Sequence, residues 1–173
     1  MTAQLHPRAE DEMRATVMIV DDEPNVLEGL RQALRGAHYE VVTACGPVEA
    51  LVVLQERKVD IVISDHLMPG MTGAELLGLV HDRQPDAVRI MLSGHADAET
   101  VIRTINEGEV YRFLTKPCDR TELLVTLHLA CEKLELEREN RRLLALIRAQ
   151  PELLVRVEGG KAAPRSTVDG DGA

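Results

Sequence analysis

A chain of 173 residues is long enough for one domain with appendages, and its formal net charge of -9 works against non-specific binding to nucleic acid or anionic lipid. Its three cysteines are widely spaced and fit neither a disulfide framework nor a Cys/His metal site, so we expect reduced, small apolar side chains. The polar N-terminus lacks a signal-peptide run, and nothing approaches the roughly 18 uncharged apolar residues of a membrane span, so we expect a cytoplasmic protein.

Five apolar runs of strand length alternate with five segments of helical periodicity. The first run ends at Asp21, and Val26, Leu30 and Leu34 then recur at helical spacing. In chain order, the pattern predicts strands over residues 16–20, 39–44, 59–65, 88–92 and 110–114. The helices are expected over residues 26–34, 47–57, 72–83, 97–107 and from near 119 to about 150. Short connections and near-continuous apolar strands are typical of a parallel sheet covered by helices on both faces.

Polar residues close four of the predicted strands: Asp21 and Asp22, Asp65, Ser93, and Lys116. The carboxyl ends of parallel strands meet at one edge of a sheet, so we expect these side chains to gather there. Three neighbouring carboxylates repel each other unless a cation lies among them, and hard oxygen ligands suit Mg²⁺. A hydroxyl and a lysine beside such a metal would stabilise a phosphoryl group in transfer, and a carboxylate can accept that group. Asp65, between the other acids and the lysine, is the natural acceptor.

Each of these residues also has an ordinary structural interpretation. The aspartates could cap helices or turns, and Ser93 could be a turn residue. Lys116 could be a solvated surface side chain, and Phe113 could be a core aromatic. The joint occurrence of these residues at one predicted edge favours the phosphoryl-transfer site.

Four blocks of sequence, each at a strand end, resemble the receiver domain of bacterial two-component response regulators. They are VMIVDDEP at 17–24, ISDHLMPGMTG at 63–73, IMLSGH at 90–95 and FLTKP at 113–117. The resemblance covers residues 15 to 130 and implies a flavodoxin-like (βα)5 fold with a doubly wound, parallel five-stranded sheet. It implies a phosphorelay protein that uses Mg²⁺. Such a protein catalyses only its own phosphotransfer and slow dephosphorylation and is not a classical enzyme.

The resemblance also implies roles for the acidic residues. By that resemblance Asp65 is the phosphorylated residue, and Asp22 binds Mg²⁺ directly with the assistance of Asp21. The backbone carbonyl of Leu67 would supply a further metal ligand.

The remaining motif residues are similar to the family's switch and to its dephosphorylation positions. By the resemblance Ser93 is the hydroxyl that follows the phosphoryl group, Lys116 is its cation, and Phe113 is the aromatic that changes rotamer with it. Leu67 and His95 stand where many receivers carry polar or acidic residues that orient the hydrolytic water. An apolar Leu67 should hinder that water and lengthen the phosphoryl lifetime.

Two other classes of function are the alternatives: a scaffold of receiver shape, and a small enzyme on the same fold such as a carrier or a hydrolase. A receiver-shaped scaffold could act through its C-terminal helix without phosphorylation, although the intact acids, hydroxyl and lysine argue against it. A nucleotide or flavin carrier would need a Gly/Ser-rich loop after the first strand, where this chain has Asp21-Asp22-Glu23. A haloacid-dehalogenase-like hydrolase would need a second aspartate two residues after the first, and this spacing is missing.

The last helix carries a heptad pattern beyond the receiver. Leucines recur every seven residues, with a second seam series beside them: Leu129, Leu136 and Leu143, with Lys133, Asn140 and Ile147. Leucine at one seam position with asparagine at the other is typical of a parallel two-stranded coiled coil. A single solvated helix of mixed charge is the alternative.

These patterns predict the organisation of the chain and its partners. We expect a disordered tail over 1–14, a receiver domain over 15–131, a helical extension over 132–155 and a disordered tail over 156–173. The expected partners are a sensor histidine kinase or phosphotransfer protein, a separate output protein and a second copy of the chain. No direct nucleic-acid or membrane contact is expected.

Overall fold

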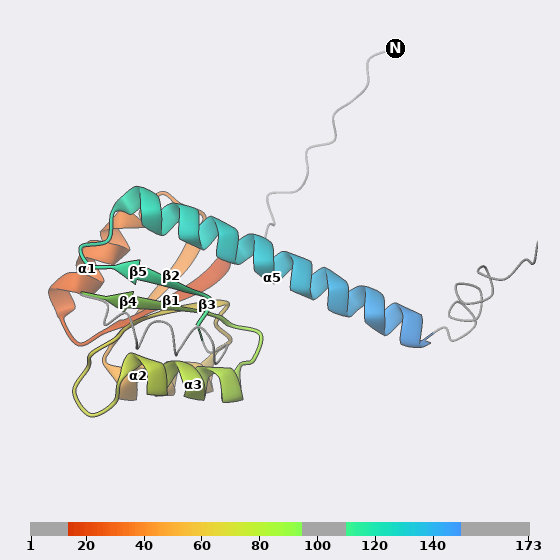
Figure 1. Ribbon diagram of the computed structural model, residues 1–173, viewed down its shortest axis with the longest axis horizontal. Helices are drawn as coiled ribbons and strands as arrows, with labels where there is room; N and C mark the ends of the chain where they lie inside the picture. Colours follow the sequence, from red (N-terminus) through yellow and green to blue (C-terminus); the bar gives the residue numbers. More distant parts are fainter. Residues whose placement is uncertain (1–13, 95–109, 150–173) are drawn as a thin grey trace, which may run out of the picture. The chain divides into compact units, whose positions relative to one another are not determined.

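The computed structural model describes residues 14–94 and 110–149. The first elements in chain order are β1 (Ala15–Asp21), α1 (Pro24–Ala33), β2 (Tyr39–Cys45), α2 (Pro47–Glu56) and β3 (Ile61–Asp65). They are followed by α3 (Gly73–Arg83), β4 (Val88–Ser93), β5 (Arg112–Thr115) and α5 (Arg120–Ala149) (Figure 1). The helix expected over 97–107, the two terminal tails and His95 lie outside the described residues.

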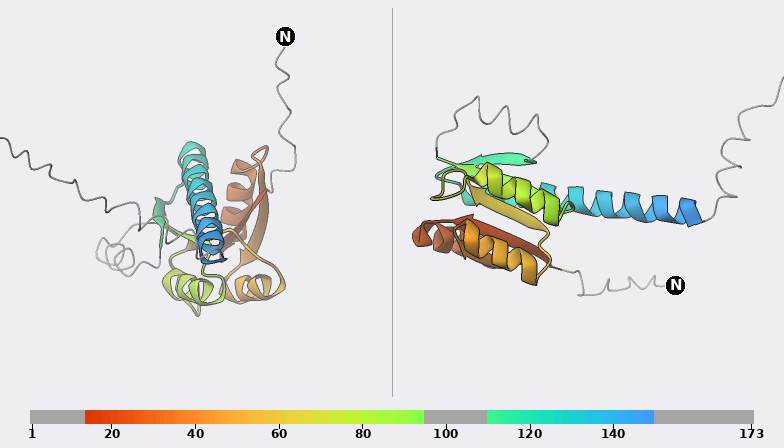
Figure 2. Two further views of the ribbon diagram at one scale, coloured as in Figure 1. Left: turned by 90° about the vertical axis from the view of Figure 1, so that its right-hand side faces the viewer. Right: turned by 90° about the horizontal axis from the view of Figure 1, so that it is seen from below.

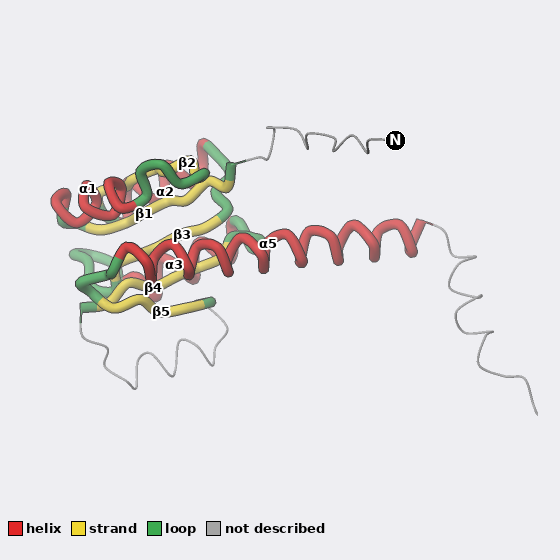
Figure 3. Tube along the Cα trace, turned by 90° about the horizontal axis from the view of Figure 1, so that it is seen from above, coloured by secondary structure: helices red, strands yellow, loops and turns green. Residues whose placement is uncertain are grey.

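The five strands form one parallel sheet in the order β2-β1-β3-β4-β5. The tube view shows them side by side (Figure 3). Helix α1 and the first part of α5 cover one face, while α2 and α3 cover the other (Figures 1 and 2). The predicted flavodoxin-like parallel sheet is therefore confirmed.

Strand alternation divides the core into two layers. In β1, Val17 and Ile19 face the layer under α1 and α5, whereas Met18 and Val20 face the layer under α2 and α3. All four side chains are almost fully buried. Burial of each contributes roughly 1.5–3 kcal/mol to folding. Every position of β3 is buried as well, which explains its near-continuous apolar run up to Asp65.

The side chain of Gln84 joins two loops at the amino-terminal edge of the sheet. Its Oε1 accepts a hydrogen bond from the Val59 backbone N–H at 2.8 Å, while its Nε2 donates to the carbonyls of Leu54 at 3.0 Å and Arg57 at 2.9 Å. One amide thus fastens the end of α2 and the start of the β3 segment to the end of α3.

We expect the Gln84→Ala variant to lower the free energy of unfolding by about 2–3 kcal/mol, because the buried Val59 N–H loses its partner. Urea titration followed by circular dichroism measures the loss. Gln55→Ala is the matched control, since Gln55 is an exposed glutamine on α2 and its removal should change stability by less than about 0.5 kcal/mol. Equal effects of the two variants would contradict the role given to Gln84.

Packing divides the chain within α5, where the first compact unit ends at Leu134. Leu134 is 2% exposed, whereas Leu136 is 72% exposed. All residues from 135 to 149 are exposed, and Arg142 pairs with Glu139, three residues earlier on the same helix, at 3.9 Å. The coiled coil expected for this part of α5 stays a prediction. Among the residues described, no helix is long and apolar enough to cross a membrane.

The three cysteines are free thiols. Cys118 and Cys131 are partly buried and pack against the core layer under α1 and α5. Burial raises the pKa of Cys118 to about 11, helped by the charges of Glu122 and Asp119. Cys45 is exposed at the end of β2.

Candidate functional site

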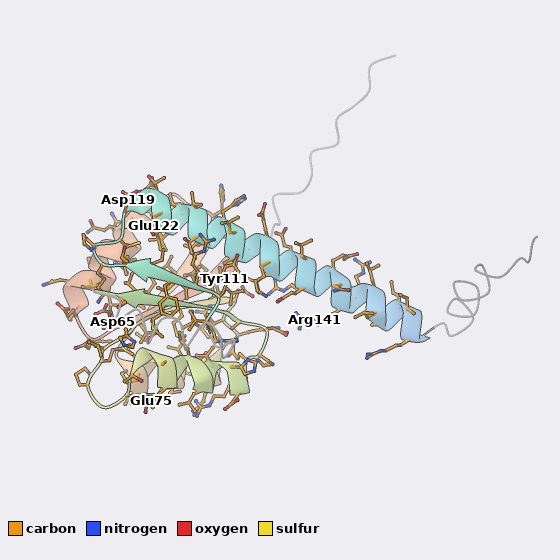
Figure 4. All side chains as sticks on the ribbon, in the orientation of Figure 1. Asp65, Glu75, Tyr111, Asp119, Glu122 and Arg141 are labelled. Atoms are coloured by element: carbon orange, nitrogen blue, oxygen red, sulfur yellow. The ribbon has the colours of Figure 1, made fainter. Side chains whose placement is uncertain are left out.

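The carboxyl edge of the sheet collects the polar residues that close its strands. Asp21 ends β1, Asp65 ends β3, Ser93 ends β4, and Lys116 directly follows β5. Figure 4 labels Asp65 at this edge. The backbone N–H of Lys116 donates to the carbonyl of Ser93 at 2.8 Å, which fixes the lysine beside the end of β4. Parallel pairing therefore brings together residues that are far apart in the sequence.

Three carboxylates converge at this edge. Asp21, Asp22 and Asp65 each offer an oxygen, and these oxygens lie within 4.8 Å of one another. Asp21 and Asp65 are buried, while Asp22 is exposed. Oxygen donors at this spacing, with one side open to solvent, suit a hard divalent cation such as Mg²⁺, which keeps several waters when bound.

Lys116 bridges the two buried acids. Its Nζ lies 2.7 Å from Oδ2 of Asp21 and 2.7 Å from Oδ1 of Asp65. Burial alone would lower the pKa of Lys116, but the hydrogen bonds that its ammonium donates to Asp21 and Asp65, together with the charges of these acids, outweigh burial and raise this pKa. The lysine therefore stays protonated at neutral pH, and the ion pairs are lost only as the pH rises through the raised pKa.

Hydrogen bonds from neighbouring residues hold Asp65 in place. The N–H of Leu67 donates to Oδ2 of Asp65 at 3.2 Å, and the Ser64 hydroxyl donates to the Asp65 carbonyl at 3.0 Å. The N–H of Gly73 donates to the His66 carbonyl at 2.9 Å. A Cβ atom on Gly73 would lie 2.1 Å from the Asp65 carbonyl oxygen, so only glycine allows α3 to begin this close to the end of β3.

The start of α3 is also fixed by a capping box. The Thr72 hydroxyl accepts a hydrogen bond from the Glu75 N–H, and the Glu75 carboxylate accepts one from the Thr72 N–H. The hydrogen bond from the Thr72 backbone lowers the pKa of Glu75, which Figure 4 labels on α3. This reciprocal pair closes the loop that follows Asp65.

The other predicted site residues lie around this cluster. Ser93 is buried, and Phe113 is partly buried against the core layer under α2 and α3. The Leu67 side chain is 72% exposed, although its backbone contacts Asp65. The switch and dephosphorylation roles of these residues stay predictions.

Three features of the site were not foreseen from the sequence. They are the contact of Lys116 with Asp21, the close approach of Gly73 to Asp65, and the His66 side chain. The Nδ1 of His66, in the loop after β3, is buried and has no hydrogen-bond partner among the described residues. A glycine directly after a helix-capping threonine was the available signal for the close approach.

Comparison with known proteins gives one consistent result. Residues 17–128 match the family model described as the response regulator receiver domain. The hydrogenase transcriptional regulatory protein HoxA of Cupriavidus necator is 36% identical over 130 residues, which cover 75% of this chain and 27% of HoxA. The transcriptional regulatory protein GlrR of Escherichia coli K12 is 33% identical over 154 residues, which cover 89% of this chain and 34% of GlrR.

A solved structure agrees with these relatives. The signal receiver domain of an HD domain-containing protein from Pseudomonas fluorescens Pf-5 is similar, with a TM-score of 0.67 and 38% identity. The match covers 70% of this chain and 98% of that domain. The chain thus spans a whole solved receiver domain but about a third or less of the two regulators.

Proposed function

Because this chain belongs to the response regulator receiver domain family, we propose that it takes a phosphoryl group onto Asp65 in a phosphorelay. The observation that carries the proposal is the cluster at the carboxyl edge of the sheet. There the buried Asp65 carboxylate shares the Lys116 ammonium with Asp21 and lies beside the exposed Asp22. This arrangement supplies an acceptor, a cation and further acidic ligands in one place.

The residues of the cluster fit a magnesium ion. Asp21, Asp22 and Asp65 would hold it through carboxylate oxygens, with the backbone carbonyl of Leu67 as a further ligand. The bound ion supplies positive charge that offsets the acids and the incoming phosphoryl oxygens.

The chain's own groups position and stabilise the transfer. A carboxylate oxygen of Asp65 attacks the phosphorus of a partner's phosphohistidine, so that an O–P bond forms and an N–P bond breaks. The imidazole keeps the electron pair of the broken bond. Lys116 lies where it can offset the charge on the transferred group, because it already contacts Asp65.

The product carries the signal through charge. Aspartyl phosphate adds negative charge at the sheet edge, as other phosphorylations do. The Ser93 hydroxyl and Lys116 follow the phosphoryl group, and Phe113 then turns inward and changes the surface around β5 and α5. The protein is thus a signalling switch, and its only catalysis is its own phosphotransfer and slow dephosphorylation.

Incubation with acetyl phosphate tests the proposed function without a kinase. We expect labile phosphate to be incorporated with Mg²⁺ present and to be absent when a chelator removes the metal. A receiver-shaped scaffold that never becomes phosphorylated predicts no label under either condition. A label that is independent of metal would contradict the role given to the acidic cluster.

The relatives indicate the kind of partners. We propose a sensor histidine kinase or phosphotransfer protein as donor and an output protein or domain that reads the switch. A cytoplasmic location accords with these partners. We expect no direct binding of nucleic acid by the described residues, because on α5 glutamates interleave with the arginines and offset their positive charge.

Leu67 should lengthen the lifetime of the phosphoryl group. Its exposed side chain stands two residues after the acceptor and offers no hydrogen bond to a hydrolytic water. We expect dephosphorylation of the Leu67→Asn variant to be several-fold faster, as one hydrogen bond of about 1 kcal/mol allows. Decay of radiolabelled protein after removal of the donor measures the lifetime. Equal or slower decay would rule out this role.

We also propose that the exposed end of α5 pairs with a second copy of the chain as a parallel coiled coil. Its seam is formed by Leu136, Asn140, Leu143 and Ile147, and all four side chains are exposed. A buried asparagine at one seam position favours two parallel strands.

Sedimentation equilibrium tests this pairing. The Leu143→Asp variant should weaken self-association at least about tenfold, because it buries an unpaired charge in the seam. Ala145→Asp, on the side of the helix away from the seam, should have little effect. A wild-type chain that stays monomeric at all concentrations would contradict the pairing.

A further inference from the structure

The ring of Tyr111 connects the start of β5 with α5. The Tyr111 backbone N–H donates to the carbonyl of Arg89 at 2.7 Å, so this residue is held beside β4 although it precedes β5. The Nζ of Lys133, on α5, lies 5.9 Å from the centroid of the Tyr111 ring. Figure 4 labels Tyr111 between the start of β5 and α5. An ammonium group this close to a ring makes a cation–π contact.

Tyr111 is close in sequence to the proposed switch. Phe113 lies two residues later on β5, a strand of only four residues, and pairs with Met91 of β4. Tyr111 and Phe113 are therefore both held against β4 by the same short segment. A movement that Phe113 imposes on this segment has to be accommodated at Tyr111 as well.

Lys133 lies at the point of α5 where the leucines change from buried to exposed. Leu134, the next residue, is packed against the core, whereas Leu136 is exposed. Lys133 is also seven residues before Asn140, in the same seam series. In a parallel pair of helices, lysines at this position would face each other and repel. The contact with the Tyr111 ring fixes the position of this ammonium group.

We propose that the contact between Tyr111 and Lys133 transmits the phosphorylation state of Asp65 from β5 to the C-terminal part of α5. The inference rests on the proposed function, because it needs the rearrangement at Phe113. Movement of β5 shifts the Tyr111 ring and so changes the position of the Lys133 ammonium. Tyr111 acts here as a positioning residue: it touches no reacting atom and fixes the side chain of Lys133, seven residues before Asn140 of the seam.

Nuclear magnetic resonance of the full chain tests the inference through its four lysines, Lys58, Lys116, Lys133 and Lys161. The ring current of Tyr111 should displace the ε-methylene signal of Lys133, which is assigned by its disappearance in the Lys133→Arg variant. Tyr111→Leu should abolish this displacement. Tyr39→Phe, which alters the only other tyrosine, should leave the signal in place.

Beryllofluoride with Mg²⁺ then mimics the phosphorylated state. We expect it to shift the signals of Lys116 and Lys133, while Lys58, at the opposite edge of the sheet, stays unchanged. In the Tyr111→Leu variant, Lys116 should still respond and Lys133 should not.

The outcomes separate this inference from the proposed function. A response of Lys116 without any response of Lys133 overturns the inference and leaves the phosphorelay function intact. A Lys133 signal that is the same in wild type and Tyr111→Leu also overturns it, because the contact would then be missing in solution. If Lys116 itself does not respond, the proposed function fails and the inference fails with it.

Discussion

Replacement of Asp65 by asparagine should abolish phosphorylation of the chain. The amide keeps the size of the side chain but lacks the nucleophilic oxygen pair, and it cannot form the ion pair that the carboxylate makes with Lys116 at 2.7 Å. We expect incorporation of labile phosphate to fall from close to one phosphate per chain to background. Labelling with acetyl phosphate and Mg²⁺, followed by phosphate counting, measures the loss.

Asp82→Asn is the matched control for this variant. Asp82 lies exposed on α3, so the same chemical change there should leave labelling unaffected. Unfolding in urea should show that Asp65→Asn remains folded, since the asparagine can still accept the hydrogen bond from the Leu67 N–H. Label that persists at another residue of Asp65→Asn would show that the acceptor is misassigned.

The second large effect is expected from a single methyl group at the start of α3. A Cβ atom in Gly73→Ala would lie 2.1 Å from the carbonyl oxygen of Asp65. The clash is with backbone, so either the start of α3 or the end of β3 has to shift. Overpacking of this kind costs about 1–3 kcal/mol, and a clash with backbone belongs at the upper end of that range. We therefore expect both a lower urea midpoint and slower labelling, because the displaced carbonyl belongs to the acceptor residue.

Gly78→Ala separates this contact from the general effect of alanine in a helix. Gly78 lies on the same helix, and a Cβ there meets nothing within 4 Å. Alanine at this position should stabilise the protein by about 1 kcal/mol through helix propensity and leave labelling unchanged. If Gly73→Ala behaves like Gly78→Ala, the close approach of α3 to Asp65 is not tight in solution.

The hydrophobic periodicity and the polar residues at the strand ends were sufficient to predict the parallel sheet and the acids and lysine at its carboxyl edge. The β3 segment reads as a fully buried strand, and this strand does end on Asp65. The segment after Gly108 was expected to begin a strand at Val110, whereas β5 begins at Arg112. Val110 is buried in the core without belonging to the strand, and a hydrophobicity pattern does not distinguish these two kinds of burial.

The features that the sequence did not reveal depend on distances between separate elements. The ion pair between Lys116 and Asp21 joins residues 95 positions apart. The hydrogen bonds of the Gln84 side chain join two loops at the other edge of the sheet. The approach of Gly73 to Asp65 depends on the angle at which α3 leaves its loop. No spacing rule encodes such distances, so they become apparent only once the sheet and helices are assembled.

Identification of the modified side chain tests the central claim most directly. Borohydride reduces an aspartyl phosphate to homoserine, which changes the mass of the peptide that carries it. After incubation with acetyl phosphate and Mg²⁺, we predict that mass spectrometry will find homoserine at position 65 alone, and none when the metal is chelated. Homoserine at another aspartate, or equal amounts with and without Mg²⁺, would contradict the account.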